Sequence, residues 1–242
     1  MKQTNSLMKS AAFAAVLAAA VAPSALAGAT APAEKALGFN LSLTTDTFFG
    51  FAPMAAASYS LSDKLDVTAY GIFWSGGNNG GNWGNWTEAG AGVNYALTDY
   101  LSINPQLGFL GGNLISSTAA DEPVMGDGIV PNVTINLSSD NWEGQVYFGA
   151  YLTLREVDGA TSAEFLHYWT TFGRKLNPYV SAGVHYEQLC GGNDNIDSEI
   201  YTWVGPYVQL TEPTTGTFLR VAAGADVTAA DSFYKMTFGV SF

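Results

Sequence analysis

Apolar and polar residues alternate with a period of two along most of this chain, and no other feature restricts the fold as strongly. The last residues show the pattern most plainly. Small or polar residues separate large apolar ones there: Tyr234, Met236, Phe238, Val240 and Phe242. Successive side chains of a β-strand point to opposite faces, so this period predicts a strand with one apolar face. Because chain termini are usually loose, such a strand must be tied into a sheet, and its apolar face must meet something other than water.

The same pattern recurs along the chain and predicts an all-β protein. Most segments are close to the roughly 9–11 residues that a tilted strand needs to cross a bilayer. The twelve approximate spans are 36–46, 53–61, 64–75, 86–97, 100–111, 128–138, 141–155, 162–173, 176–189, 199–210, 216–227 and 232–242.

The connections between these segments alternate in length. Short polar turns are expected at 60–65, 96–101, 137–142, 173–178 and 211–216. Longer segments are expected at 75–86, 112–127, 156–161 and 190–199. This layout is typical of a transmembrane barrel with short periplasmic turns and longer extracellular loops. An even number of strands then places both termini on the periplasmic side.

The N-terminal residues predict export. Lys2 and Lys9 precede the apolar run 10–23, and Ala25, Leu26 and Ala27 form an A-x-A cleavage site. We therefore expect a signal peptide over residues 1–27 and a mature barrel over residues 28–242. An uncleaved anchor is the alternative, but a transmembrane helix needs about 20 apolar residues.

The charge balance argues against a nucleic-acid partner. The chain has 9 Lys and Arg against 21 Asp and Glu, and cleavage would remove two of the bases, Lys2 and Lys9. Such an acidic chain has no excess of bases with which to neutralise phosphates, and it does not resemble a basic membrane-surface module. Cys190 is the only cysteine, so no internal disulfide is expected.

A soluble β-sandwich is the main alternative fold, because its strands also alternate. The opposite face of these strands carries Gly, Ser, Thr, Asn and charges, which suit a lumen better than a sandwich core. Aromatic residues also mark the strand ends, as in an aromatic girdle: Tyr59, Trp74, Trp86, Tyr95, Tyr100, Trp142 and Tyr234. We therefore predict a single antiparallel up-and-down transmembrane β-barrel, with one strand for each of the twelve segments.

Every backbone N–H and C=O must be paired within a bilayer, so the last strand must close on the first. The tail resembles the C-terminal signature of Gram-negative outer-membrane β-barrel proteins, a final Phe preceded by apolar residues at alternate positions. The residues that carry the resemblance are Tyr234, Phe238, Val240 and Phe242. The resemblance implies an outer-membrane location, contact with outer-membrane lipid and lipopolysaccharide, and recognition of the tail by the barrel-assembly machinery. It implies nothing about a substrate.

Projection of the strands onto their two faces predicts a set of lumen-facing residues. They are Asp46, Asp66, Glu88, Glu143, Arg155, His185, Glu187, Arg220, Asp226 and Lys235. These groups either pair with one another and fill the lumen, because an unpaired buried charge is costly, or line a pore that selects a small solute. A barrel of this size has room for either arrangement.

The sequence carries no clear catalytic or metal-binding motif. His167 and His185 are the only histidines; His185 shares the polar face with Ser181 and Glu187, while the face of His167 is ambiguous. A lipid hydrolase would need its His and Ser on the lipid side, and no G-x-S-x-G motif occurs. The acidic segment 191–199 lacks the EF-hand spacing. We expect no enzyme activity, no metal and no cofactor.

Passive passage of a small solute is therefore the favoured function. A structural or surface-binding barrel with a plugged lumen is the second hypothesis, and its binding residues would lie in the segments 75–86 and 112–127. A lipid-modifying enzyme of the outer membrane is the remote alternative.

Overall fold

The computed structural model of the protein describes residues 37–74, 86–112, 115, 124–155, 158–159 and 161–242. The predicted signal peptide and most of the predicted segments 75–86 and 112–127 lie outside the described residues. Within the described ranges, no helix is long and apolar enough to cross a membrane. The strands are β1 (Leu37–Asp46), β2 (Gly50–Ser62), β3 (Leu65–Trp74), β4 (Trp86–Thr98), β5 (Leu101–Gly112), β6 (Val124–Ser138), β7 (Trp142–Thr153), β8 (Phe165–Asn177), β9 (Val180–Gly191), β10 (Tyr201–Glu212), β11 (Thr217–Asp226) and β12 (Asp231–Ser241).

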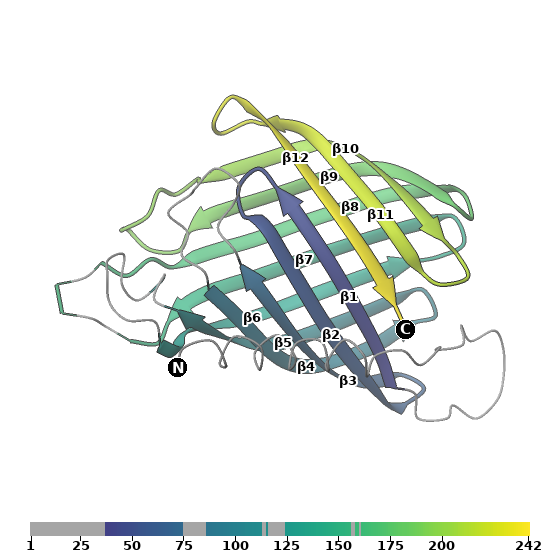
Figure 1. The fold of residues 1–242 in the computed structure, drawn as a ribbon, viewed down its shortest axis with the longest axis horizontal. Coiled ribbons are helices and arrows are strands. Elements are labelled where there is room, and N and C mark those ends of the chain that lie inside the picture. Colours follow the sequence, from purple (N-terminus) through teal and green to yellow (C-terminus); the bar gives the residue numbers. More distant parts are fainter. Residues whose placement is uncertain (1–36, 75–85, 113–114, 116–123, 156–157, 160) are drawn as a thin grey trace, which may run out of the picture.

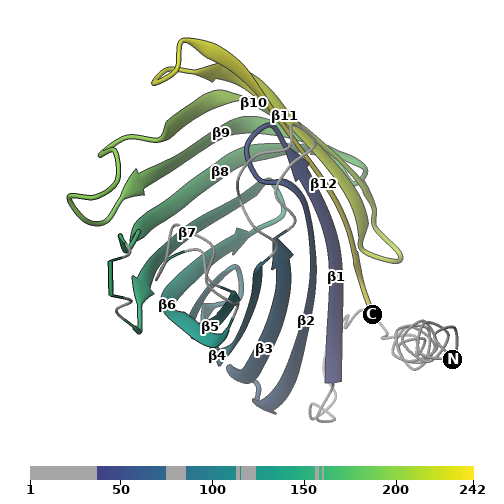
Figure 2. The same cartoon turned by 60° about the vertical axis from the view of Figure 1, so that its left-hand side comes forward.

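These strands form one closed antiparallel barrel, which confirms the predicted fold class. Each strand pairs with its neighbours in the sequence, and β12 pairs with β1. Figure 1 shows the seam, with β12 lying beside β1 and the C-terminus at the end of the barrel where β1 begins. Turned by 60°, the strands are seen to wrap around a single interior (Figure 2).

The seam between β1 and β12 runs from Asn40 opposite Ser241 to Asp46 opposite Lys235. Backbone bonds continue past the strand end, because Phe39 N donates to Phe242 O (3.1 Å) and Phe242 N donates to Phe39 O (2.8 Å). Side chains also cross the seam, and the hydroxyl oxygens of Thr44 and Thr237 lie 3.2 Å apart. The predicted closure of the last strand on the first is therefore confirmed.

The barrel has two different ends. We call the end at which β1 begins and β12 finishes the terminal end, and the opposite one the loop end. Short connections at 63–64, 99–100, 139–141, 178–179 and 213–216 lie at the terminal end, as the sequence predicts. The loop end carries the longer segments, but also two short turns that join β1 to β2 and β11 to β12, at 47–49 and 227–230.

Two strand boundaries differ from the sequence prediction. Strand β6 begins at Val124, inside the segment expected to be a loop. Its register against β5 shifts between Leu110 and Gly111, and Gly126 has a φ of +83°, so the period of two is interrupted there. Strand β7 ends at Thr153, and Arg155 therefore lies beyond the strand on which its lumen position was predicted.

Large apolar side chains cover the outside of the barrel. Nearly every strand contributes at least one that is exposed, for example Leu43, Phe51, Val67, Val93, Phe109, Val146, Phe172, Val184, Val208, Val221 and Phe238. An apolar band of this extent is not found on proteins surrounded by water, and it suits contact with hydrocarbon. A soluble sandwich is therefore excluded, because its apolar face would be buried between two sheets.

The aromatic girdle is smaller than predicted. Tyr59, Tyr95, Tyr100, Trp142 and Tyr234 are exposed on the outside. The prediction is wrong for Trp74 and Trp86, which pair across β3 and β4 and point inward. Trp86 occupies the same face of β4 as Glu88, so alternation was the better guide than its position at a strand end.

A charge on the outer face should be far more costly than one on the inner face of the same strand. Met236 lies in the middle of β12 and is 42% exposed on the outside, whereas its neighbour Thr237 lines the interior. We expect Met236→Arg to lower the free energy of unfolding by about 2–4 kcal/mol in phospholipid vesicles. Urea titration of the refolded protein measures it, with Thr237→Arg as the matched control. Equal effects of the two substitutions would contradict the assignment of faces.

Candidate functional site

Bulky side chains fill the interior of the barrel toward the loop end. We call this group the lumen plug. Its buried members come from the turn after β1, from eight strands and from loop residues: Phe49, Trp86, Leu110, Ile115, Val130, Tyr151, Ala163, Phe165, Leu189, Tyr201, Trp203 and Phe233. Trp203 stacks between Tyr201 and Phe233, with ring centroids 4.2 and 4.9 Å away.

The turn between β1 and β2 folds inward, and its two phenylalanine rings reach side chains on the other side of the lumen. Asp46 Oδ1 accepts hydrogen bonds from the backbone N–H groups of Phe48 (3.0 Å) and Phe49 (2.6 Å), which fixes the turn. The Phe49 ring then lies 5.4 Å from His167 on β8, and the Phe48 ring lies 4.8 Å from Tyr201 on β10. Because β8 stands opposite β2 in the strand order, these rings span the barrel.

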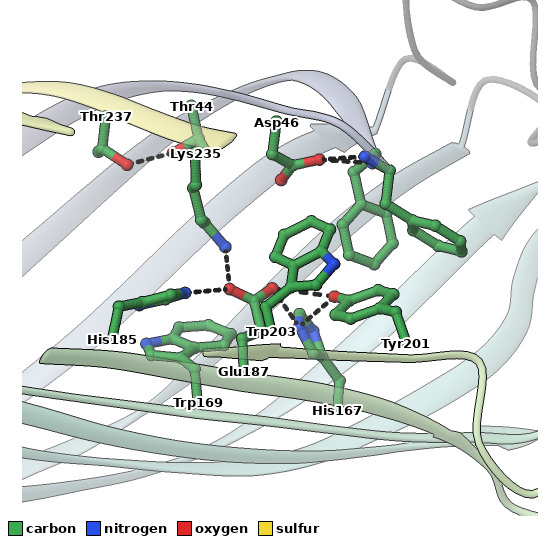
Figure 3. Close-up of polar contacts among 12 residues, drawn as sticks. Thr44, Asp46, His167, Trp169, His185, Glu187, Tyr201, Trp203, Lys235 and Thr237 are labelled. Atoms are coloured by element: carbon green, nitrogen blue, oxygen red, sulfur yellow. Dashed lines mark hydrogen bonds and ion pairs between the residues drawn. The ribbon is translucent and has the colours of Figure 1, made fainter. Parts of the chain in front are cut away.

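A buried carboxylate lies directly beneath the plug, on the side of the terminal end. Glu187 on β9 has no exposed surface, and its oxygens contact four side chains, which we call the Glu187 cluster (Figure 3). Oε1 lies 2.9 Å from both His167 Nε2 and the Tyr201 hydroxyl. Oε2 lies 3.1 Å from His185 Nε2 and 2.6 Å from the ammonium nitrogen of Lys235. The cluster therefore joins β8, β9, β10 and β12.

Lys235 reaches its partner from the seam strand β12, and Figure 3 shows its side chain directed at Glu187. The ammonium nitrogen also lies 5.3 Å from the centroid of the Trp169 ring, within the range of a cation–π interaction. A carboxylate and an aromatic face together thus hold one ammonium group inside the barrel. The carboxylate of the cluster has an internal cation as its counter-ion, and it is not an open metal site.

A second buried carboxylate lies in the wall formed by β3 and β4. Glu88 accepts hydrogen bonds from the Tyr70 hydroxyl (2.6 Å) and from Trp74 Nε1 (3.3 Å), and from the Tyr151 hydroxyl. Asn132 Nδ2 on β6 donates to the Tyr70 hydroxyl at 2.9 Å. We call these five residues the Glu88 cluster.

Glycines on the next two strands make room for Tyr70. Gly90 stands opposite Tyr70, and a Cβ on it would lie 2.7 Å from Tyr70 Cζ. A Cβ on Gly108 would lie 3.1 Å from Glu88 Oε1. Both positions must therefore remain glycine for the ring to lie flat against the wall, where it leaves the lumen open.

The third acid in the wall, Glu143, lies closer to the terminal end. It accepts hydrogen bonds from Ser181 Oγ (2.7 Å) and the Tyr207 hydroxyl (2.9 Å). Arg220 on β11 donates from Nε to Gln209 Oε1 (2.8 Å), and its guanidinium lies 5.2 Å from the centroid of the Tyr207 ring. Tyr207 and Gln209 thus link the acid to the base.

A cavity of about 740 Å³ extends from the terminal end up to the plug. Small hydroxyl and amide side chains line its lower part, among them Asn40, Ser42, Thr44, Thr68, Asn104, Gln106, Asn136 and Thr237. The Glu88 cluster, His167, His185, Trp169, Arg220 and Lys235 line its upper part. The interior is therefore polar and open toward one end, and aromatic and filled toward the other.

The predicted lumen residues have three different placements. Asp46, Glu88, His185, Arg220 and Lys235 border the cavity itself. Glu143 and Glu187 lie in the wall and contact the groups that border it, as described above. The remaining three, Asp66, Asp226 and Arg155, lie away from these clusters.

Asp66 lies toward the terminal end, where its carboxylate accepts hydrogen bonds from Ser60 Oγ (2.8 Å) and Asn94 Nδ2 (3.2 Å). Asp226 lies at the loop end, where it accepts a hydrogen bond from Trp203 Nε1 (3.2 Å) and fixes the turn after β11. The lumen position of Arg155 stays a prediction, because the residue lies outside β7. Its Nε lies 3.4 Å from Asp127 Oδ1, beyond the end of β7.

Sequence reasoning missed several members of the clusters. His167 was ambiguous because aromatic residues flank it on both faces of β8, and its pairing with Leu189, which shares a face with Glu187, is what places it inside. Tyr70, Tyr201 and Trp203 are large aromatic residues, which alternation alone does not separate from lipid-facing ones. The available signal was the polar residue on the same face of the same strand, Asp66 for Tyr70 and Gln209 for Tyr201 and Trp203.

The fold resembles those of solved outer-membrane proteins. An outer-membrane channel from Pseudomonas putida F1 superimposes with a TM-score of 0.55 at 12% identity, covering 88% of this chain and 97% of the other. The NanC porin superimposes with a TM-score of 0.53 at 9% identity, covering 84% and 98%. At these identities the likeness concerns the fold alone. No curated protein matches the sequence.

A family model described as a family of unknown function, DUF6733, matches residues 4–242, and the chain belongs to that family.

Removal of one charge from the Glu187 cluster should destabilise the folded barrel more than removal of both charges of the ion pair. Glu187→Gln would leave the Lys235 ammonium without its counter-ion inside the barrel, and we expect the free energy of unfolding to fall by about 3–5 kcal/mol. Combining Glu187→Gln with Lys235→Met removes both charges and should restore most of that loss. Urea unfolding in vesicles measures both variants. A double variant that is as unstable as the single one would contradict the ion pair.

Proposed function

We propose that this member of the DUF6733 family is an integral outer-membrane β-barrel that lets small solutes pass through its lumen, with the lumen plug as the closing element. The observation that carries the proposal is the cavity of about 740 Å³, which is lined by polar side chains and runs from the terminal end to the plug. A barrel that served only as a scaffold would not need a hollow interior.

The membrane location draws support from three features of the chain. The outer face is apolar around the barrel, residues 1–27 have the pattern of a signal peptide, and the tail ends with the Phe signature of outer-membrane barrels. The recognition of Tyr234, Phe238, Val240 and Phe242 by the assembly machinery, and contact with lipopolysaccharide, remain predictions of this proposal.

Passage requires movement of the plug, because its rings fill the lumen in the structure described here. The turn that carries Phe48 and Phe49 is the suitable moving part. It is a short connection between two strands, and Asp46 and the ring contacts hold its position. Withdrawal of these two rings would remove the contacts that link β1 and β2 to the opposite wall.

A plugged structural barrel is the second candidate, and the lumen plug itself favours it. An enzyme receives less support. Both histidines of the chain face the interior, and both contact Glu187, so the lipid-facing side has no histidine that could act as a base on a phospholipid.

Conductance of the refolded barrel distinguishes these two candidates. Residues 28–242 in a planar bilayer should give brief, small openings, because the plug closes the lumen most of the time. Phe48→Ala combined with Phe49→Ala should raise the open time and the conductance several-fold. Phe51→Ala is a matched control, because that residue is the second of β2 and its ring faces outward.

If the unmodified barrel shows no conductance, the proposed passage is contradicted and the plugged structural barrel is favoured. This holds whether or not the double variant conducts. Equal behaviour of the control and the double variant would contradict the gating role of the turn.

A further inference from the structure

The Glu88 cluster encloses a carboxylate that forms no ion pair with a cationic side chain of the described residues. Glu88 is only 2% exposed, and its side-chain partners Tyr70, Trp74 and Tyr151 are all neutral donors. None of the ion pairs among the described residues includes Glu88. A buried carboxylate without a counter-ion carries a large desolvation cost, which a bound cation would offset.

The Glu187 cluster shows how this interior holds an ammonium group. There the Lys235 nitrogen lies 2.6 Å from the carboxylate and 5.3 Å from the centroid of the Trp169 ring. The Glu88 cluster contains the same two elements, a buried carboxylate and aromatic rings, but no lysine or arginine. The Glu88 cluster therefore has the groups that bind an ammonium ion, but none of its own residues supplies one.

The aromatic rings near Glu88 extend to Trp169, the ring that lies beside Lys235. Tyr147 stacks on Trp169 with ring centroids 3.9 Å apart and an angle of 13° between the planes. Trp86 stacks on Tyr151 at 6.3 Å, and Trp74 lies 6.1 Å from Trp86. Aromatic faces attract cations through the quadrupole of the ring, most strongly where water is excluded.

The cavity gives a solute access to this surface. Tyr70, Trp74, Glu88, Tyr147 and Tyr151 all border it. The charges on its wall favour a cation: Lys235 is neutralised by Glu187, and Arg220 is linked to Glu143 through Tyr207 and Gln209. Asp46 and Glu88 also border the cavity, and neither makes an ion pair with another described residue. A lumen with this balance raises the local concentration of cations.

We propose that the Glu88 cluster is a binding site for a small organic cation, with the ammonium group against Glu88 and the alkyl groups against Trp74, Tyr147 and Tyr151. The inference deepens the proposed function, because it names the class of solute, and it relies on that function for the biological use of the site. Binding itself needs only the cavity, and it can be measured without conduction.

Choline is a suitable probe, and 3,3-dimethylbutan-1-ol is its uncharged match in shape. We expect calorimetric titration of refolded residues 28–242 in a nonionic detergent to show choline binding about tenfold tighter than the alcohol, which corresponds to about 1.4 kcal/mol. Glu88→Gln keeps an acceptor for the Tyr70 hydroxyl and removes the charge, and it should weaken choline binding about tenfold.

Asp66→Asn is the matched control, since it removes one carboxylate from a position outside the cluster and should leave choline affinity within about twofold. Trp74→Leu removes a ring but not the charge, and it should weaken binding about three- to tenfold. This variant carries the test if Glu88→Gln does not fold, which heat-modifiable gel mobility reports.

Equal affinities for choline and the alcohol would overturn the inference, and so would equal losses in Glu88→Gln and Asp66→Asn. Choline binding by a barrel that is silent in planar bilayers would uphold the site and overturn the passage. Conductance without choline binding would uphold the passage of solutes and overturn the binding site.

Discussion

Backbone pairing between the first and last strands is the constraint on which this structure depends. A membrane offers no water to an unpaired N–H or C=O group, so a sheet that spans it cannot have an edge. The pairing of β1 with β12 removes that edge and fixes the register from Asn40 to Asp46. The same register sets Lys235 opposite Asp46, and from there its ammonium reaches Glu187. The buried ion pair is thus a consequence of closure.

Side-chain size along the inner face explains why one half of the lumen is filled and the other is open. On β1 the inner residues from the terminal end are Asn40, Ser42, Thr44 and Asp46, all small and polar. On β3 they change from Asp66 and Thr68 to Tyr70 and Trp74 toward the loop end. The rings meet in the plug, and the small residues leave the cavity. Glycines extend this effect, because Gly90 and Gly108 let Tyr70 lie along the wall.

The fold could be predicted from the sequence because each strand carries its own period of two, and the outer face repeats it around the barrel. Positions that break the period were predicted less well, as where the register shift at Gly111 and the positive φ of Gly126 hide the start of β6. The clusters could not be predicted, because contacts across the lumen depend on how the sheet curves and how far each side chain reaches. Glu187 and Lys235 are 48 residues apart, and no local pattern relates them.

One face of each strand meets lipid and the other meets the lumen, and neighbouring positions at the seam allow both faces to be tested together. Leu43 stands opposite Phe238 on the outside, and Thr44 stands opposite Thr237 on the inside. Each would be changed to Cys in a Cys190→Ser background, labelled with a fluorophore and exposed to lipids that carry a quencher on the acyl chain. We expect strong quenching at 43 and 238 and weak quenching at 44 and 237. Equal quenching at all four positions, or none at any, would contradict this assignment of faces.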